Sequence, residues 1–438
     1  MIWLLALPLA YLMWRTLARG RIEYTHREAF TLGNLYYMAL PLAIASTTED
    51  FGEVWLGPWR MIARLPGQAG VTRMIVWSVA LWACFLLGDA LARRRGTSDV
   101  DLSGPIGAAV RDRAAWTVVL TGGAIALGLF GAAWAVVNRA ILFTGYANFQ
   151  ETAAAGALQA AIAFMTYISV TAALLRAALP RFAVRLAVLV LGFLGVLTLS
   201  TGGRQTFVLA LIAALVCRSV LRDGVPRRTF VALGIAGVLL FGFIGAWRSG
   251  VADTGHLFGS IAAEPLFTFL SFTTLVAFTY LPAFAFPTPL ISSFGNIVPS
   301  VIWSDKLDYF KHLLDQFRYY SPLGALSLGA SMLINFGWIG ALVAATAGGF
   351  GVERLRQGAM RHPLLLASYC IVVPVLTLDL WRNPMEIPIV KNMFEVGLLL
   401  PVALLIAKNL LAARPHAPSS RSGTCAPNND AEWKASIP

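Results

Sequence analysis

The stretch LSTGGRQTFVLALIAALV, residues 199–216, joins the end of one apolar run to the beginning of the next. The pair Gly202–Gly203 permits a tight turn, and Arg204 follows it directly. An apolar run of about 20 residues is long enough to cross a bilayer as a helix. The stretch therefore predicts two membrane helices joined by a glycine hinge. It also raises the question of whether Arg204 only anchors a helix end or binds an anion.

The composition of the whole chain agrees with a membrane protein. Of the 438 residues, 58% are apolar and 13% are charged, and the mean hydropathy is +0.70. A soluble domain is nearer half apolar and one quarter charged. We therefore expect an all-α, polytopic integral membrane protein. The net charge of +12 is explained by basic cytoplasmic loops, so a nucleic-acid partner is not expected.

Apolar runs divide the chain into about 11–12 predicted transmembrane helices. The first run lacks the basic region and cleavage site of a signal peptide and is interpreted as a retained helix with an external N-terminus. Residues 1–414 form the predicted transmembrane domain, and residues 415–438, rich in Ser, Pro and Asn, a disordered cytoplasmic tail. The runs lie at 1–14, 30–46, 74–92, 116–137, 157–179, 186–201, 205–221, 229–247, 325–348, 363–381 and 393–411.

Clusters of Lys and Arg give the orientation, because such clusters favour the cytoplasmic side. They lie at 15–21, 93–95, 180–185, 217–228 and 352–362. The segments expected outside are 47–73, 138–156, 248–324 and 382–392. The apolar stretch 264–284 does not fit the alternation as a full span, so we expect it to be re-entrant or interfacial, covered by protein. The large external (periplasmic) segment 248–324 is then the expected roof of an active site.

Many basic residues fall on the expected outer side, where the positive-inside rule does not place them. Snorkelling to lipid headgroups explains any single one, whereas their number favours an anion site. Arginine suits phosphate, because its planar guanidinium donates two parallel hydrogen bonds. The sequence has no nucleotide-binding loop and no motif with metal-ligand spacing, and its four cysteines suggest no disulfide framework. A phosphorylated lipid is the anion expected at this surface. The residues are Arg60, Arg64, Arg139, Arg204, Arg248, Lys306, Lys311, Arg318, Arg382 and Lys391.

Three motifs in order resemble a known family. They are STGGRQTF (200–207), NIVPSVIWSDK (296–306) and GALSLGASMLINFGWIGALVA (324–344). Over about residues 190–400 the chain resembles the O-antigen polymerases (Wzy) and oligosaccharide repeat-unit polymerases, relatives of the O-antigen ligases. The resemblance implies a metal-independent glycosyltransferase without a cofactor in the bacterial inner membrane. Its donor and acceptor would be undecaprenyl-pyrophosphate-linked glycans, and a chain-length regulator is a possible partner.

The resemblance also implies roles for particular residues. Cations in a water-poor site would stabilise the charge that develops on the leaving pyrophosphate. Arg204 and Arg248 are the expected catalytic cations. The residues expected to bind substrate are Trp303, Lys306, Arg318, Asn335 and Arg382.

The general base is left open by the sequence. The external candidates are His256, Glu264, Asp305 and His312. The ligase relatives carry an external histidine before a late helix, whereas this chain has Ser327 and Gly329 there, which argues against a ligase. A transporter or flippase of a lipid-linked sugar is the other alternative, but inverted repeats typical of transporters are not visible in the sequence.

Overall fold

We describe a computed structural model of the chain. The structure describes residues 2–17, 21–47, 53–56, 59–62, 68–94, 103–142, 154–201, 204–222, 224–248, 265–266, 268–273, 275–276, 280–298, 302–303 and 326–413.

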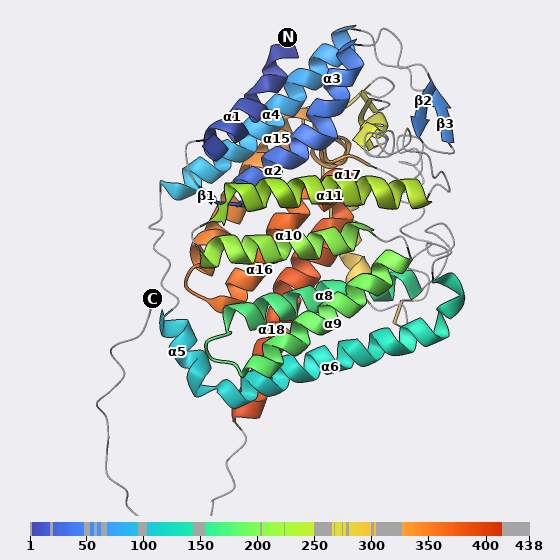
Figure 1. Cartoon of the computed structure of the whole chain (residues 1–438). Helices are drawn as coiled ribbons and strands as arrows, with labels where there is room; N and C mark the ends of the chain where they lie inside the picture. Colours follow the sequence, from blue (N-terminus) through green and yellow to red (C-terminus); the bar gives the residue numbers. More distant parts are fainter. Residues whose placement is uncertain are drawn as a thin grey trace, which may run out of the picture.

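The described residues form an all-α bundle with two short two-stranded ribbons (Figure 1). Strand β1 (Arg21–Ile22) pairs antiparallel with β4 (Val225–Pro226), with Arg21 opposite Pro226. Strand β2 (Glu53–Leu56) pairs antiparallel with β3 (Trp59–Ile62). The first half of the chain contributes η1 (Ile2–Leu5), α1 (Ala6–Leu17), α2 (His26–Asn34), η2 (Leu35–Ala39), α3 (Leu40–Thr47), α4 (Gln68–Arg93), α5 (Ser103–Arg111), α6 (Arg113–Val137), η3 (Arg139–Ile141), α8 (Ala154–Leu174), α9 (Arg181–Ser200), α10 (Arg204–Leu221) and α11 (Arg227–Arg248). The second half contributes α13 (Thr288–Ser293), η4 (Phe294–Ile297), α15 (Leu328–Ala359), α16 (Pro363–Pro374), η6 (Val375–Asp379), α17 (Leu380–Arg382), η7 (Pro388–Leu399) and α18 (Leu400–Ala412).

Among the residues that the structure describes, seven helical segments are long and apolar enough to cross a membrane, and this supports the expectation of an all-α polytopic membrane protein. Their outward side chains include large apolar residues such as Leu129, Val137 and Leu189, which are 67–80% exposed, as lipid-facing residues would be. The predicted number of 11–12 spans is larger than these seven, and the described part of α10, Gln205–Leu221, is a shorter apolar helix. The seven are Ala69–Arg93, Arg113–Val137, Gly156–Leu174, Arg181–Ser200, Leu328–Ala359, Pro363–Arg382 and Pro388–Ala412.

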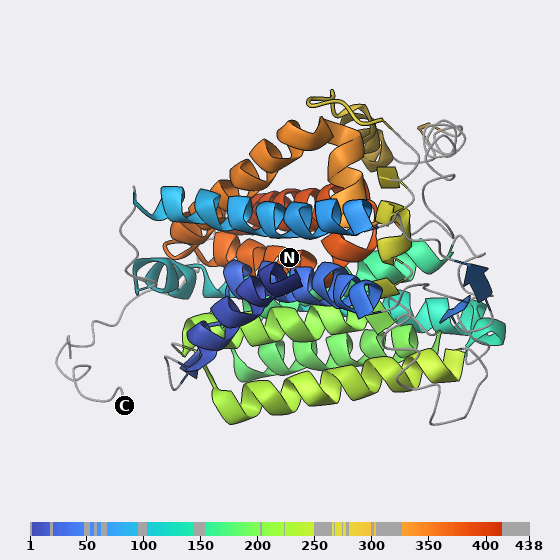
Figure 2. The same cartoon turned by 90° about the horizontal axis from the view of Figure 1, so that it is seen from above.

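The predicted basic clusters gather at one end of the bundle, which we call the basic end. There β1 pairs with β4, and the Arg21 guanidinium donates to the carbonyl of Arg222. At the same end Gln357 donates to the carbonyl of Ala92 at 3.3 Å, and Asp112 pairs with Lys408. Helices α10 and α11 run between this end and the opposite one, the far end, and α16 leads toward the far end through η6 and α17 (Figures 1 and 2). The described parts of the predicted basic clusters therefore lie on one side of the bundle.

Helix α15 is broken at Gly337, where the backbone adopts φ 73° and ψ −176°. A Cβ at this position would lie 2.4 Å from the carbonyl oxygen of Pro282, so the position requires glycine. The break exposes backbone groups, and the neighbouring chain satisfies them: Trp338 donates to Pro282, and Ile339 to Ala283. In Figure 2 the two halves of α15 form an inverted V. The sequence had predicted one continuous span here, at 325–348.

Only part of the predicted re-entrant stretch 264–284 is described. Its helical turns at 268–273 are buried. The Ser271 hydroxyl accepts a hydrogen bond from the backbone of Ser327, just before α15. Protein therefore covers this piece, whereas Tyr280 and Phe284 at the end of the stretch are exposed, so the re-entrant or interfacial interpretation of 264–284 stays a prediction.

Candidate functional site

The far end of the bundle contains a cluster of polar side chains around Asp379. Its carboxylate accepts hydrogen bonds from Gln205 at 2.5 Å, from Asn383 at 2.6 Å and from Asn392. The oxygen of the Gln205 amide in turn accepts from the Arg382 guanidinium. A single glutamine thus connects the carboxylate to the arginine, and we call these five residues the Asp379 cluster.

Irregular helix geometry positions the members of this cluster. Pro374 lies inside the helix and has no backbone N–H to donate, and the chain widens into the π-helical segment η6, which ends at Asp379. Asn392 lies on η7, which is also π-helical and begins at Pro388. Gln205 is the second residue of α10, directly after Arg204 of the predicted glycine hinge. Such π-helical segments occur frequently at functional sites.

A second carboxylate, that of Glu386, follows Asn383 by three residues and is only 6% exposed. It accepts hydrogen bonds from the Ser331 hydroxyl at 3.0 and 3.2 Å and from the Asn335 amide. These donors are neutral, and no Lys or Arg of the described residues forms an ion pair with Glu386. Burial raises the pKa of the Glu386 carboxyl, while hydrogen bonds from its own backbone, Asn335 and Ser331 oppose that rise.

The first half of α15 presents the donors for Glu386. Ser331 and Asn335 are four residues apart and so lie on one face of the helix. Ser327 caps the helix by accepting from the backbone N–H of Ala330 at 3.2 Å. The Asn335 amide oxygen accepts from the backbone N–H of Leu290 at the start of α13. The serine- and glycine-rich motif 324–344 therefore provides the side chains that hold Glu386. Gly337, in the same motif, ends the half-helix that carries them.

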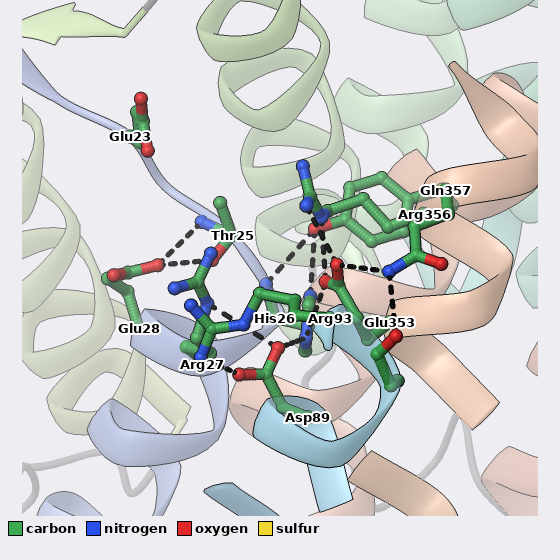
Figure 3. Close-up of polar contacts among 12 residues, drawn as sticks. Glu23, Thr25, His26, Arg27, Glu28, Asp89, Arg93, Glu353, Arg356 and Gln357 are labelled. Atoms are coloured by element: carbon green, nitrogen blue, oxygen red, sulfur yellow. Dashed lines mark hydrogen bonds and ion pairs between the residues drawn. The ribbon is translucent and has the colours of Figure 1, made fainter. Parts of the chain in front are cut away.

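The basic end contains a different polar cluster, centred on His26 (Figure 3). The Nε2 atom of His26 lies 2.9 Å from Asp89 and 3.6 Å from Glu353. Its Nδ1 atom lies 3.0 Å from the hydroxyl of Tyr369. His26, Asp89 and Glu353 are all fully buried. Desolvation by burial lowers the pKa of His26, which opposes the effect of the two carboxylates.

Arginines surround the carboxylates of this cluster. Arg356 donates two hydrogen bonds to Glu353, at 2.7 and 2.8 Å. Arg93 pairs with Asp89, and Arg27 lies 3.6 Å from the same carboxylate. On the other side of α2, Arg15 pairs with Glu28 at 2.8 Å and with Glu23 at 3.7 Å. Four arginines thus face four carboxylates, and we call this set, with His26, the His26 network.

Three atoms of the network have a spacing that would suit a metal ion, because ligand atoms of His26, Asp89 and Glu353 lie within 4.8 Å of one another. The surrounding charges oppose this interpretation. A metal would sit beside Arg27, and Arg356 already occupies both oxygens of Glu353. Because the arginines already neutralise both carboxylates, the donor set does not fit a cation, and we interpret the network as an ionic connection between α1, α2, α4 and α15.

The structure places some of the sequence-predicted residues in the far-end site. Arg382 belongs to the Asp379 cluster, and Asn335 holds Glu386. Arg204 begins α10 and Arg248 ends α11, but their side chains lie outside the described part of the chain. Trp303 is described and is partly buried. The remaining predicted substrate-binding residues and the candidate bases lie outside the described ranges: Lys306, Arg318, His256, Glu264, Asp305 and His312.

Sequence reasoning missed the carboxylates of both clusters. A signal was present, because Asp89 and Asp379 lie within predicted apolar runs. Ionisable residues in membrane segments mark functional or structural polar sites. Glu386 had a weaker signal, since it lies in the short polar stretch NPMEIP (383–388) between two spans.

No protein-family model, curated protein or solved structure matches this chain. The chemistry of the two clusters therefore has to carry the functional interpretation.

Proposed function

We propose that the protein polymerises undecaprenyl-pyrophosphate-linked oligosaccharide repeat units into a surface polysaccharide at the outer face of the bacterial inner membrane. The observation that carries the proposal is the far-end site, where two buried carboxylates lie on one short segment beside Arg382. The basic loops lie at the opposite end, so the positive-inside rule assigns the far end to the outer face. This is the side on which a lipid-linked glycan would be extended.

The chemistry of the site suits transfer from a lipid pyrophosphate. When the bond from sugar to pyrophosphate breaks, negative charge develops on the leaving oxygen, and fixed cations stabilise it. Arg204 and Arg248 are the proposed catalytic cations, and Arg382 binds the same anion. The amides of the Asp379 cluster and Trp303 offer hydrogen bonds and an aromatic face to sugar. Lys306 and Arg318 complete the proposed set of substrate-binding residues.

A transporter or flippase of a lipid-linked sugar is the second candidate, favoured by the broken helix α15. Discontinuous helices form the substrate sites of many transporters, usually in matching pairs from an inverted repeat. In the described part of the chain, Gly337 is the one glycine of positive φ inside a helix. A second break of this kind is not present among the described residues, so we propose the polymerase ahead of the transporter.

Reconstitution distinguishes the two functions. The purified protein in liposomes is incubated with undecaprenyl-pyrophosphate-linked repeat units extracted from a strain that lacks this gene. A polymerase produces longer glycans and releases undecaprenyl pyrophosphate. A flippase moves the lipid between leaflets and leaves the glycan length unchanged, and that result would contradict the proposal.

Substitution of arginine by lysine tests the anion site itself. Lysine keeps the charge but loses the paired donors, so we expect Arg204→Lys and Arg382→Lys each to lower polymerisation about 100-fold. Arg139→Lys is the matched control, because Arg139 is an exposed residue whose side chain forms no hydrogen bond or ion pair with Asp379 or Glu386 in the described part of the chain. Activity like that of the wild type in Arg204→Lys would show that this arginine is only a helix anchor.

A further inference from the structure

We propose that Glu386 is the general base that accepts the proton of the acceptor sugar hydroxyl, with Ser331 and Asn335 as positioning residues. This inference rests on the proposed polymerase function and names a group that the sequence left unassigned. It depends on the contrast between the two carboxylates of the far-end site.

Glu386 has the environment of a proton acceptor. It is buried, it receives its side-chain hydrogen bonds from a hydroxyl and an amide, and no arginine or lysine of the described residues pairs with it. A buried carboxylate without a cation holds a proton more tightly than an exposed one. A general base needs this property, because its pKa then lies nearer to the working pH.

Asp379 is less suited to the role. Three amide groups donate to it, and through Gln205 it is connected to Arg382. Asp379 is as deeply buried as Glu386, so the difference between them lies in their contacts: these donors occupy the lone pairs of Asp379 and favour its ionised form. We assign Asp379 to the orientation of Arg382 and the amides, and leave Glu386 as the base.

The local chain fixes Glu386 and keeps it within reach of the surface. Prolines at 384 and 388 flank it, and the backbone N–H of Met385 donates to the Ser331 hydroxyl at 3.1 Å. The same hydroxyl donates to Glu386, so it bridges the loop and the carboxylate. The neighbouring Asn383 and Ile387 are partly exposed. In the proposed reaction the acceptor sugar approaches Glu386 from the side of Asn383 and Ile387.

The proposed step balances without any further reactant. The acceptor hydroxyl oxygen forms a bond to the anomeric carbon of the donor sugar, and its proton passes to the Glu386 carboxylate. The bond from the anomeric carbon to the pyrophosphate oxygen breaks, and its electron pair leaves with undecaprenyl pyrophosphate. The arginines hold that anion, and the protonated Glu386 later gives its proton to water.

The first test is Glu386→Gln, which keeps the size of the side chain and removes the base. We expect kcat for polymerisation to fall about 100-fold or more, with partial recovery in Glu386→Asp. Undecaprenyl pyrophosphate alone should raise the melting temperature of wild type and Glu386→Gln equally, because the anion site is intact. Asp379→Asn is the matched control: it should raise KM through loss of Arg382 orientation, and leave the pH profile in place.

The second test uses the pH dependence, which a merely structural role would not move. Polymerisation requires ionised Glu386, so kcat/KM falls on the acid side with the pKa of this carboxyl. The Ser331 and Asn335 donors favour the ionised form, so Ser331→Ala and Asn335→Ala should move the acid limb to higher pH.

The outcomes separate the two proposals. If the wild type polymerises and Glu386→Gln keeps kcat within about threefold, or the acid limb stays in place in Ser331→Ala and Asn335→Ala, the assignment of Glu386 is overturned while the polymerase remains. If the wild type yields no longer glycans although it binds undecaprenyl pyrophosphate, the polymerase function and the base assignment both fail.

Discussion

The His26 network and the far-end site both contain buried carboxylates, but the partners of these carboxylates differ in charge. In the network, each of Asp89 and Glu353 has an arginine beside it, and the whole set is balanced in charge. In the far-end site, Glu386 is held by neutral donors. A balanced ionic cluster connects helices and leaves little reactivity, whereas a carboxylate without a cation keeps its affinity for a proton. The difference separates a structural connection from a proposed reactive group.

The orientation of the protein in the membrane offers the sharpest test of this comparison, because each end of the bundle is either outside the cell or inside it. In a background with Cys84 and Cys425 replaced by Ser, single cysteines replace Ala140 near the far end and Arg361 at the basic end. We expect an impermeant maleimide to label Ala140→Cys from the outside and Arg361→Cys only after the cells are opened. The reverse pattern would place the far-end site in the cytoplasm and remove the basis of the polymerase proposal.

Removal of a charge from the network should cost far more stability than removal of the charge from Glu386. Glu353→Gln leaves the half-buried Arg356 without its carboxylate, and breaking a buried pair in this way costs about 3–5 kcal/mol. The double variant Glu353→Gln/Arg356→Gln should recover part of the loss, because the unpaired charge is gone. The measurement is unfolding in detergent, with polymerisation per folded molecule recorded in parallel. A large loss of activity without a loss of stability would instead make the network part of the reaction.

Close packing of α4 and α15 brings Asp89 and Glu353 together, and adjacent glycines test it. A Cβ on Gly349 would lie 2.0 Å from the backbone oxygen of Phe85, whereas a Cβ on Gly348 meets nothing within 4 Å. Gly349→Ala should therefore destabilise the protein by about 1–3 kcal/mol. Gly348→Ala should be neutral or slightly stabilising, because alanine favours a helix. Equal effects of the two substitutions on the melting temperature would contradict the packing.

Much of the helix pattern was predictable from the sequence, and the polar clusters mostly were not. Hydropathy located α6, α10 and α11 to within three residues at each end, because lipid and core both require apolar side chains. The break at Gly337 could not be predicted, because it depends on the backbone of Pro282 and Ala283. The partners of Glu386 and His26 could not be predicted either. Asn335 contacts Glu386, and Glu353 contacts His26, only after helices that are far apart in the sequence have packed together.

The smallest expected effect is a pair of opposite pH dependences of stability. Burial lowers the pKa of His26, so its contribution to stability is full above about pH 6.5 and is lost as the pH falls through its lowered pKa. Burial raises the pKa of Glu386, so its contribution is full below about pH 4.3 and is lost as the pH rises through its raised pKa. A tenfold change in an acid dissociation constant corresponds to about 1.4 kcal/mol, so the difference in stability between the two ends of the pH range measures the pKa shift of each group.

Differences between the wild type and single variants isolate these two contributions. Melting temperatures are recorded from pH 4 to 8, and each variant is subtracted from the wild type so that other groups cancel. The wild type should lose stability at acid pH as His26 becomes protonated, and His26→Gln should lack this loss. Glu386→Gln should remove a loss at neutral pH and so melt higher than the wild type there, even while it loses activity. That combination is expected of a residue kept for its reactivity at a cost in stability. If Glu386→Gln melted lower than the wild type at neutral pH, Glu386 would resemble the carboxylates of the His26 network, and the contrast between the two regions would no longer hold.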